Sequence, residues 1–376
     1  MNQLNRFLIL SVLFFWGISV VSAAQPVQPG AKSGWQAEWE RVLKAAKDEG
    51  SVVVLGPPGN DVRRALTEGF EKSFPGIKVE YSGATGAIMA PRLLGERKAG
   101  QYLADVHVGN PGTTLTTLLP IGALDPIAPA LILPDAVEPT KWWRGKIEFS
   151  DRDAKYNIVF STNVMTHVAV NPQLVKKGEI RSYGDLLDPK WQGKMVMLDP
   201  TILGPGSATL GFWYLHPDLG KEFIRKFFGQ QKVIISRDNR QILEWLVRGN
   251  YSIAAGPSEL LATELIAKGL SVGLLHPDQF KEGGMLNAGF GAVALINRAP
   301  RPNAAKVYIN WLLSKDGQTD YSRASGYPSR RLDVPRDQFD PGSLPKESTQ
   351  YIVGYDERFS RTLEEVMEFG KSLLTK

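Results

Sequence analysis

Short apolar runs alternate with segments of helical periodicity along most of the chain, and this alternation restricts the possible folds more than any other feature. Residues 51–55, 77–81 and 104–108 are apolar or alternating runs that are too short for helices. Between them, residues 61–74 and 87–100 have helical spacing and end at Pro-Gly or Gly. Strands that alternate with helices of this length predict an α/β unit with a mostly parallel sheet.

A second series of the same kind follows a long strand region at residues 156–170. The chain then returns to the first unit through a predicted strand at 288–296 and a helix at 303–313. Two lobes joined by more than one crossing place the expected site in the cleft between them, at the carboxyl ends of strands. The second series has predicted strands at 194–198, 233–235 and 251–255 and predicted helices at 207–216, 219–228, 238–247 and 259–268.

The composition excludes several classes of protein. The 376 residues contain no cysteine, which rules out disulfide scaffolds, thiol nucleophiles, thiolate metal sites and a lipid-modified N-terminal cysteine. Hydrophobic residues make up 43% and charged residues 22%, as in folded globular proteins. The 44 Lys and Arg exceed the 39 Asp and Glu by 5, but they form no dense basic run, so nucleic acid is not an expected partner.

The N-terminus has the pattern of a secretory signal peptide. Arg6 precedes an apolar run at residues 7–21, and Ser22-Ala23-Ala24 supplies small residues for cleavage. The run is shorter than the ~20 residues that a membrane-spanning helix needs, so we expect cleavage rather than anchoring. We therefore assign residues 1–24 to a signal peptide and residues 25–34, rich in Pro, Gly, Gln and Ser, to a flexible leader.

The sequence carries no recognisable catalytic motif. Its four histidines are far apart in the chain, and none forms a pair with metal-ligand spacing. The glycine-rich segment 204–211 lacks the lysine of a phosphate-binding loop, and a nucleophile elbow is absent. We therefore predict no catalytic residue, no metal and no cofactor. The histidines are His107, His167, His216 and His276.

Five turns between a predicted strand and a predicted helix are rich in Gly, Ser, Thr or Asn. Each would present backbone N–H groups and the positive end of a helix dipole to a carboxylate, phosphate, phosphonate or sulfonate. For any single turn, ordinary helix capping is the alternative. Their number, together with the export signal, favours anion binding. The turns span residues 56–60, 82–86, 110–114, 204–207 and 256–258.

The predicted ligand-binding residues come mainly from these turns. Ser82 and Thr85 would offer hydroxyls beside backbone donors. Arg237 follows a predicted strand and would supply a countercharge, although a solvated surface arginine is the alternative. Asn287 precedes the returning strand and would line the cleft from the hinge side. The full set is Asn60, Ser82, Gly83, Ala84, Thr85, Asn110, Gly206, Ser207, Arg237, Ser258 and Asn287.

A further pattern is spread over nearly the whole mature chain. It consists of Glu96-Arg97 ahead of Gly100, Ala104-Asp105-Val106, and the segments 183–194, 302–306, 310–318 and 329–335. These segments resemble bacterial extracellular solute-binding proteins of the ferric-iron, thiamine and polyamine type.

The resemblance implies a two-lobed periplasmic-binding-protein fold of type II, in which each lobe is a mostly parallel sheet flanked by helices and the ligand cleft lies between the lobes. We place the first lobe at 35–158 with 285–325, the second at 159–284, and a C-terminal segment that packs on the lobes at 326–376. The expected protein is a monomer, free in the periplasm, that delivers a small-molecule anion to an ABC transporter permease and closes about a hinge.

The chain departs from the ferric-iron members at one place in the second lobe. Those members typically carry adjacent tyrosines after the strand that corresponds to 251–255, where this chain reads Gly256-Pro257-Ser258-Glu259. We therefore favour an organic anion of the carboxylate, phosphonate or sulfonate type over ferric iron, which is the alternative. A ligand-binding partner of a membrane sensor and an enzyme of the same bilobed architecture are further alternatives.

Overall fold

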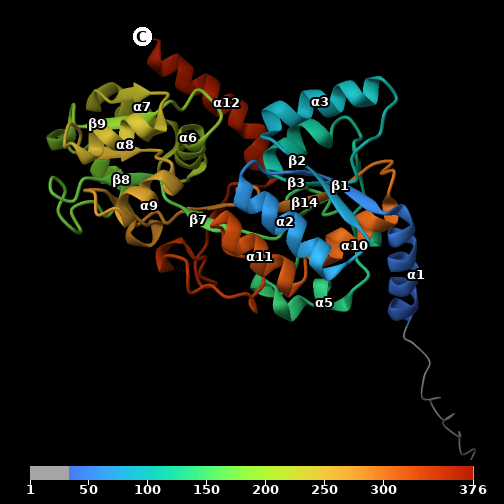
Figure 1. The fold of residues 1–376 in the computed structure, drawn as a ribbon. Coiled ribbons are helices and arrows are strands. Elements are labelled where there is room, and N and C mark those ends of the chain that lie inside the picture. Colours follow the sequence, from blue (N-terminus) through green and yellow to red (C-terminus); the bar gives the residue numbers. More distant parts are fainter. Residues whose placement is uncertain (1–33, 376) are drawn as a thin grey trace, which may run out of the picture.

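Two lobes of sheet and helices lie side by side, each with its own hydrophobic core (Figure 1). The computed structural model describes residues 34–375. The predicted signal peptide and all of the predicted leader except Gly34 lie outside these residues. Within the described range, no helix is both long enough and apolar enough to cross a bilayer.

The first lobe is built on a sheet with strand order β2-β1-β3-β14-β6-β5, and β4 also pairs with β14. β1 is parallel to β2 and β3, whereas β14 is antiparallel to β3 and β6. β1 is apolar throughout because helices cover both of its faces: Val52 and Val54 belong to one core cluster and Leu55 to another. The strands are β1 (Ser51–Gly56), β2 (Lys78–Gly83), β3 (Val106–Gly109), β4 (Leu124–Asp125), β5 (Glu148–Phe149), β6 (Asn157–Val159) and β14 (Ala292–Ile296).

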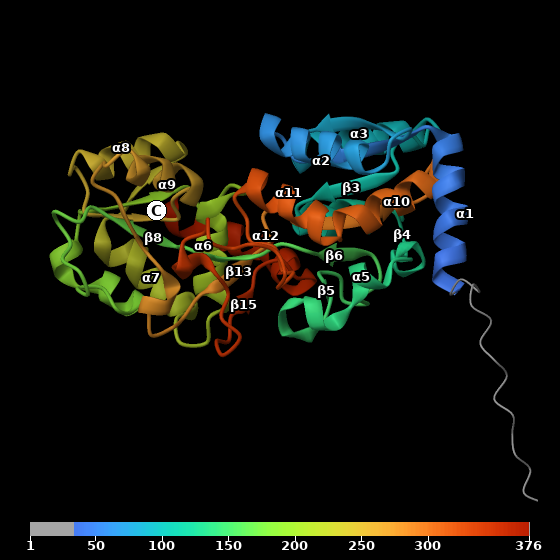
Figure 2. The same ribbon diagram turned by 60° about the horizontal axis from the view of Figure 1, so that its bottom comes forward.

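Helices cover both faces of this sheet, as Figures 1 and 2 show. On one face α1, α2 and α10 enclose a core that includes Phe70, Tyr308 and Trp311, and on the other face α3 contributes Met89 and Leu93. The helices of this lobe are α1 (Gly34–Glu49), α2 (Asn60–Ser73), α3 (Gly86–Lys98), α4 (Pro111–Thr113), α5 (Pro134–Val137), α10 (Pro302–Leu312) and α11 (Lys315–Ser325).

The second lobe has a smaller sheet with strand order β10-β9-β11-β8-β12. β9 is parallel to β10 and β11, and β8 is antiparallel to β11 and β12. Its core is rich in aromatic rings, with Trp213 edge-on to Phe223 and Phe227. The elements are β8 (Val168–Val170), β9 (Met195–Leu198), α6 (Pro205–Leu215), α7 (Gly220–Gln231), β10 (Ile234–Ser236), α8 (Asn239–Val247), β11 (Ile253–Ala255), α9 (Glu259–Ala267) and β12 (Gly273–Leu275).

The connection between the lobes corrects two sequence predictions. The predicted strand 156–170 is three short strands, of which β6 lies in the first lobe, β7 (Asn163–Met165) between the lobes and β8 in the second. The predicted strand 288–296 begins only at Ala292, as β14, and a separate strand that was not predicted, β13 (Met285–Asn287), precedes the predicted range. The turn between β13 and β14 contains Gly289, whose φ of +53° is left-handed. Thus β7 and β13, paired antiparallel, form the crossing.

The C-terminal segment visits both lobes. Ser329 forms a bridge with Ser161, between β6 and β7, and Arg331 forms one with Trp142 of the first lobe, while β15 (Ile352–Val353) extends the β7–β13 pair. The chain ends in α12 (Glu357–Leu374), which packs against α6 through the buried Phe359 and Val366. In Figure 1 this helix extends from the junction of the lobes along the second lobe.

Candidate functional site

The first lobe presents the ends of β1, β2 and β3 toward the crossing. Contrary to the predicted loop at 82–86, Ser82 and Gly83 complete β2, because the register continues through the Leu55–Ser82 and Gly56–Gly83 pairs. Only Ala84 and Thr85 separate β2 from α3. Thr85 is the N-cap residue of α3, and among the described residues no side chain caps this helix.

An arginine that the sequence analysis did not single out accompanies Ser82. Arg92 of α3 donates to Ser82 Oγ at 2.9 Å and forms an ion pair with Glu96 at 2.7 Å. Its side chain is half exposed, at 54%. Spacing in the sequence offered no signal for this contact, because Ser82 and Arg92 meet across a strand and a helix. Arg92 is therefore an additional candidate cation on the first-lobe side.

Asn110 ties the third turn of the first lobe to the crossing. Its Oδ1 accepts from the backbone nitrogen of Gly112 at 2.8 Å, and its Nδ2 donates to the carbonyl of Gly289 at 2.9 Å. The predicted residue Asn287 accepts from the backbone nitrogen of Gly289 at 3.1 Å. The structure thus brings Asn110 and Asn287 to the same segment. Asn60, the first residue of α2, is exposed and directly follows the turn between β1 and α2.

In the second lobe, two of the predicted turns touch. A Cβ at Gly256, where φ is +62°, would lie 2.8 Å from the Cα of Gly206. Close approach of the two backbones therefore requires glycine at this contact. The hydroxyl of Ser207 is engaged within its own turn, since it accepts from Gly204 N and donates to Gly204 O at 3.0 Å each. Backbone groups are what this turn offers to a ligand.

Arg237 lies at the end of β10 as predicted, but it has an acidic partner. Its Nε donates to Asp199 Oδ2 at 2.9 Å. The arginine side chain is 76% exposed, whereas that of Asp199 is 7% exposed and also accepts from Thr201. The nearby carboxylate offsets much of the positive charge that we expected Arg237 to supply. Ser258 caps α9 by accepting from Leu261 N at 3.5 Å.

Glu259 and Tyr327 are the most important residues that the sequence analysis did not assign to the site. Glu259 begins α9 and accepts from Asn163 Nδ2 at 3.0 Å and from Thr166 Oγ1 at 3.3 Å, both next to the crossing strand β7. Burial raises the pKa of Glu259 to about 7, against the effect of these hydrogen bonds. Tyr327 is close enough for the negative charge of Glu259 to raise its pKa further above the value set by burial.

Tyr327 connects this carboxyl group to the crossing. A Cβ at Gly289 would lie 2.7 Å from the Tyr327 ring, so the ring lies against that glycine, and Asn287 lowers the pKa of Tyr327 while Glu259 raises it. Asn110 and Tyr327 thus both contact Gly289, and Glu259 of the second lobe lies near enough to influence Tyr327. Residue 327 is distant in sequence from every predicted turn, which is why no local signal identified it.

The helices that follow strands differ in how their N-termini are satisfied. Within residues 34–375, no side chain caps α2 or α3. At α6 the hydroxyl of Ser207 accepts from the backbone nitrogen of the N-cap residue Gly204, and no side chain in this part of the chain accepts from the backbone nitrogens of Gly206 and Ser207. In contrast, Asp238 caps α8 and Ser258 caps α9. Uncapped N-termini leave backbone N–H groups and the positive helix dipole available to an anion. The uncapped N-termini of α2 and α3 thus come from the first lobe, and the second lobe adds the partly capped N-terminus of α6.

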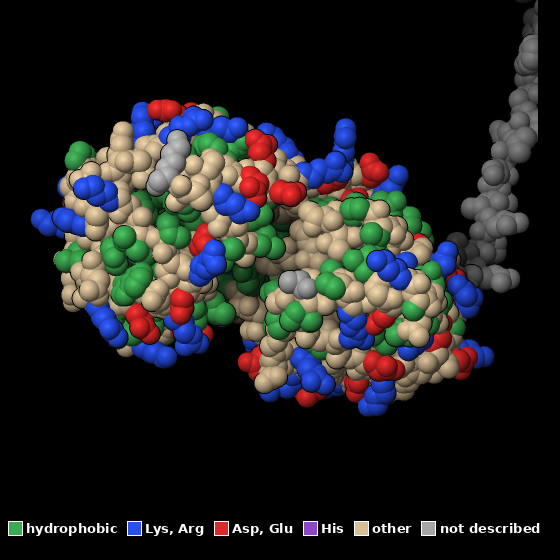
Figure 3. All heavy atoms as spheres, turned by 90° about the horizontal axis from the view of Figure 1, so that it is seen from above, with side chains coloured by type: hydrophobic (Ala, Val, Ile, Leu, Met, Phe, Trp, Pro, Cys, Tyr) green, Lys and Arg blue, Asp and Glu red, His purple; other side chains and the backbone are tan. Residues whose placement is uncertain are grey.

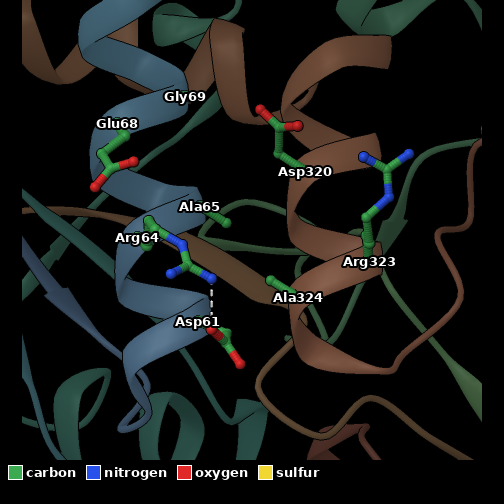
Figure 4. Close-up of a pocket in the computed structure, with 8 residues that line it drawn as sticks. All are labelled: Asp61, Arg64, Ala65, Glu68, Gly69, Asp320, Arg323 and Ala324. Atoms are coloured by element: carbon green, nitrogen blue, oxygen red, sulfur yellow. Dashed lines mark hydrogen bonds and ion pairs between the residues drawn. The ribbon is translucent and has the colours of Figure 1, made fainter.

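A hollow separates the two lobes on one face of the molecule, and hydrophobic side chains lie along its walls (Figure 3). A separate surface pocket of about 420 Å³ lies between α2 and α11 (Figure 4). Acidic and basic side chains alternate around this pocket, and Asp61 is already paired with Arg64 at 2.6 Å. Because charges of both signs line this pocket, it favours neither an anion nor a cation, and we place the candidate site in the interlobe hollow.

The model of the family described as bacterial extracellular solute-binding protein matches residues 65–341 of the chain. The chain belongs to this family. The match confirms the resemblance seen in the sequence and spans both lobes and the crossing. A comparison with curated proteins finds no sequence relative.

Solved structures of solute-binding proteins share the fold. The chain is 17% identical to iron-bound HitA from Pseudomonas aeruginosa, with a TM-score of 0.62 over 86% of this chain and 99% of that one. The Trichodesmium protein in complex with iron and citrate has 17% identity and a TM-score of 0.63, over 87% and 100% of the two chains. AfuA from Actinobacillus pleuropneumoniae, with fructose-6-phosphate bound, has 17% identity and a TM-score of 0.59, over 87% and 97%. The predicted two-lobed α/β fold of this solute-binding protein is thereby confirmed.

Proposed function

We propose that this solute-binding protein is the periplasmic component of an ABC importer and captures a small organic anion between its lobes. The observation that carries the proposal is a set of backbone N–H groups at helix N-termini from which no described side chain accepts: those of the uncapped α2 and α3 in the first lobe, and those of Gly206 and Ser207 at the partly capped α6 in the second. An anion that accepts from N–H groups on both sides would stabilise the closed arrangement. Family membership supports solute binding, and the solved structure with a bound sugar phosphate supports an anionic ligand.

The chain itself contains an example of the proposed contact. α10 has no capping side chain in its own N-cap residue, Arg301, and Glu49 from α1 takes that role. The Glu49 carboxylate accepts from Ala304 N at 2.7 Å and from Asn303 N at 3.2 Å. A carboxylate thus fits an open helix N-terminus of this protein. A ligand carboxylate, phosphonate or sulfonate would meet α3 or α6 in the same way.

Two arginines are the candidate countercharges. Arg92 lies beside Ser82 on the first-lobe side, and Arg237 lies at the end of β10 on the second. Each is paired with an acid, Glu96 or Asp199, so each would share its charge with the ligand rather than supply it whole. The backbone groups of the turns at 82–86 and 204–209 are therefore proposed to hold most of the oxyanion. Asn60, Asn110, Ser258 and Asn287 complete the proposed surroundings.

The remaining features of the proposal follow from the family and from the sequence. A signal peptide at 1–24 would export the protein, a permease would receive the ligand, and the protein would act as a monomer that is not an enzyme. The domain boundaries are proposed to lie at 158/159, within the last residues of β6, and at 284/285, immediately before β13. A membrane sensor as partner is the alternative, and a gene for a sensor kinase in place of permease and ATPase genes beside this one would favour it.

Ferric iron is a second candidate ligand, and one observation favours it. Glu259 and Tyr327 bring a carboxyl and a phenol near each other between the lobes, and hard oxygen donors of this kind suit Fe(III). Among residues 34–375, no three His, Asp or Glu side chains form a cluster suited to a metal. Adding Fe(III) citrate and recording the visible spectrum tests this candidate. A phenolate charge-transfer band that disappears in Tyr327→Phe would select iron over the organic anion.

Native mass spectrometry of protein purified from the periplasm tests the main proposal, since it reveals the mass of any ligand carried. Calorimetry with the identified anion then compares Arg92→Ala, Arg237→Ala and the double variant Ser82→Ala/Thr85→Ala with wild type. Loss of a charge-assisted contact should lower affinity roughly ten- to hundredfold. Arg248→Ala is the matched control, because Arg248 is an exposed arginine paired with Glu244 on α8. Wild-type affinity in all three variants would place the ligand elsewhere.

A further inference from the structure

Three exposed hydrophobic side chains mark the turns of the candidate site. Of the large hydrophobic side chains in residues 34–375, Leu203, Leu260 and Ile88 are the most exposed, at 78%, 68% and 67%. The next values lie at 46% and below. A single exposed leucine or isoleucine is common on protein surfaces and needs no explanation. The position of these three in the fold is what distinguishes them.

All three lie where a strand leads into a helix. Ile88 is in the first turn of α3 after β2, Leu203 directly precedes the N-cap residue of α6 after β9, and Leu260 is in the first turn of α9 after β11. The turns that carry Leu203 and Leu260 are in contact through Gly206 and Gly256. Ile88 belongs to the opposite lobe. One lobe thus presents two of the side chains and the other lobe presents the third.

The turn that carries Ile88 also lies near the crossing. A Cβ at Gly86 would collide with the side chain of Thr113, so the start of α3 lies against the turn that Asn110 begins, and Asn110 is bonded to Gly289. Figure 3 shows hydrophobic side chains along both walls of the hollow between the lobes. In the sequence, Ile88 and Leu203 therefore lie in or next to the first turns of α3 and α6, whose backbone N–H groups are proposed to hold the anion.

We infer that Ile88, Leu203 and Leu260 form an apolar contact surface for the body of the ligand, so that the solute is an amphipathic organic anion with an alkyl or aryl body. This inference rests on the proposed anion-binding function and specifies its substrate class. The open N-termini of α3 and α6 would hold the acidic head group, and the three side chains would leave water when the lobes close over the body. A compact inorganic anion would bind to the helix N-termini but leave the three hydrophobic side chains exposed to water.

Paired probes separate the two parts of the ligand. Acetate and heptanoate, methanesulfonate and hexanesulfonate, and methylphosphonate and hexylphosphonate each combine one head group with a methyl and a hexyl body. Calorimetry measures the dissociation constant of each probe. Each methylene that leaves water should strengthen binding roughly fourfold, so we expect the hexyl member of the preferred pair to bind at least about tenfold more tightly than the methyl member.

The triple variant Ile88→Ser/Leu203→Ser/Leu260→Ser should remove this preference for hexyl over methyl and leave the affinity for the methyl probe unchanged. Leu103→Ser/Leu174→Ser is the matched control, because both leucines are 46% exposed and lie away from the candidate site. Leu103 precedes β3, and Leu174 lies near Gly249, which precedes β11. Both leucines therefore lie near the starts of these strands, whereas the three substituted side chains follow the ends of strands. The control should bind every probe as wild type does.

Three results would contradict the inference. Equal affinity for methyl and hexyl probes in the wild type would leave anion binding intact and overturn the apolar contact. A hexyl preference that survives in the triple variant would also overturn it, because the three side chains would then serve lobe closure or a protein partner instead. Failure of every probe to bind would overturn the proposed anion function itself, and the inference with it.

Discussion

The carboxylate of Glu49, at the end of α1, lies 2.7 Å from the backbone nitrogen of Ala304 in α10. It also accepts from the side-chain amide of Asn303 at 2.7 Å. A side chain distant in sequence thus supplies the anion that the N-terminus of α10 lacks. The same contact fixes α1 to α10 on one face of the first lobe.

The first prediction follows from this contact. Glu49→Ala should lower the free energy of unfolding by about 1 to 2 kcal/mol, because it leaves N–H groups at the start of α10 without an acceptor. Urea unfolding, followed by tryptophan fluorescence, measures the change. Glu264→Ala, on α9 of the second lobe, is the control and should change stability little. An unchanged midpoint in Glu49→Ala would show that water replaces the carboxylate without cost.

The second prediction concerns the pH dependence produced by Glu259. Its pKa in the folded protein is raised to about 7 from 4.5, so the folded state binds more protons than the unfolded state between these values. Stability from this group is therefore greatest below pH 4.5 and falls as the pH rises to 7. Glu259→Gln should be more stable than wild type at pH 8, by at most about 3 kcal/mol, and similar to it at pH 4.

Urea midpoints of both proteins at pH 4, 6 and 8 measure this difference, with Glu264→Gln on the same helix as control. A constant gap between Glu259→Gln and wild type across this range would contradict it. The same carboxyl bears on binding: ionised Glu259 repels an anion held near it, so anion affinity in the wild type should increase from pH 8 to pH 6. Glu259→Gln should lose that increase.

The third prediction concerns His107 in β3, which lowers the stability of the protein as the pH falls, whereas Glu259 lowers it as the pH rises. The ring is 2% exposed, and burial lowers its pKa to about 4 from 6.5. The unfolded state therefore binds more protons between these values, and the stability that the neutral ring contributes is lost as the pH falls from 6.5 to 4. His107→Leu should resist acid better than wild type, by about 2 kcal/mol at pH 5 relative to pH 7.

Unfolding curves at pH 5 and pH 7 for the two proteins give this difference directly. His276, which is half-buried beside Asp340 in the C-terminal segment, provides a control substitution, His276→Leu, outside the sheet. If His107→Leu and wild type lose equal stability on acidification, another group governs the response.

Much of the fold could be predicted from the sequence because its signals are local. The apolar run at 51–55 became β1, and Asp238 caps α8 as its position before a helical pattern indicated. The late start of β14, at Ala292 rather than Ala288, could not be predicted in this way. Gly289 lies in a run that looks apolar, and only the left-handed backbone there and the packing of Tyr327 against it show that the chain turns between β13 and β14.

The candidate site was predictable to the same extent. Gly, Ser and Thr at the ends of apolar runs identified the turns, because such residues start helices wherever they occur. The partners of these turns come from elsewhere in the sequence: Asp199 reaches Arg237, and Arg92 reaches Ser82. Whether a polar group in a turn is free for a ligand depends on such contacts, which no local pattern encodes.

The last prediction uses the pairing of Asp199 with Arg237. Asp199→Asn removes a buried negative charge and keeps a side chain of similar shape that can still accept from Thr201 and Arg237. More of the positive charge of Arg237 then reaches an anion bound between the lobes, so anion affinity should rise several-fold. The anion affinity of Asp199→Asn should also fall more steeply with added salt than that of the wild type, because the arginine is largely exposed.

Calorimetry at two salt concentrations measures both effects of Asp199→Asn. Asp199→Asn combined with Arg237→Ala should remove the gain, which separates the charge of Arg237 from any change in the shape of the turn. If Asp199→Asn weakens anion binding, Asp199 serves chiefly to position the loop before α6, and Arg237 is not a countercharge.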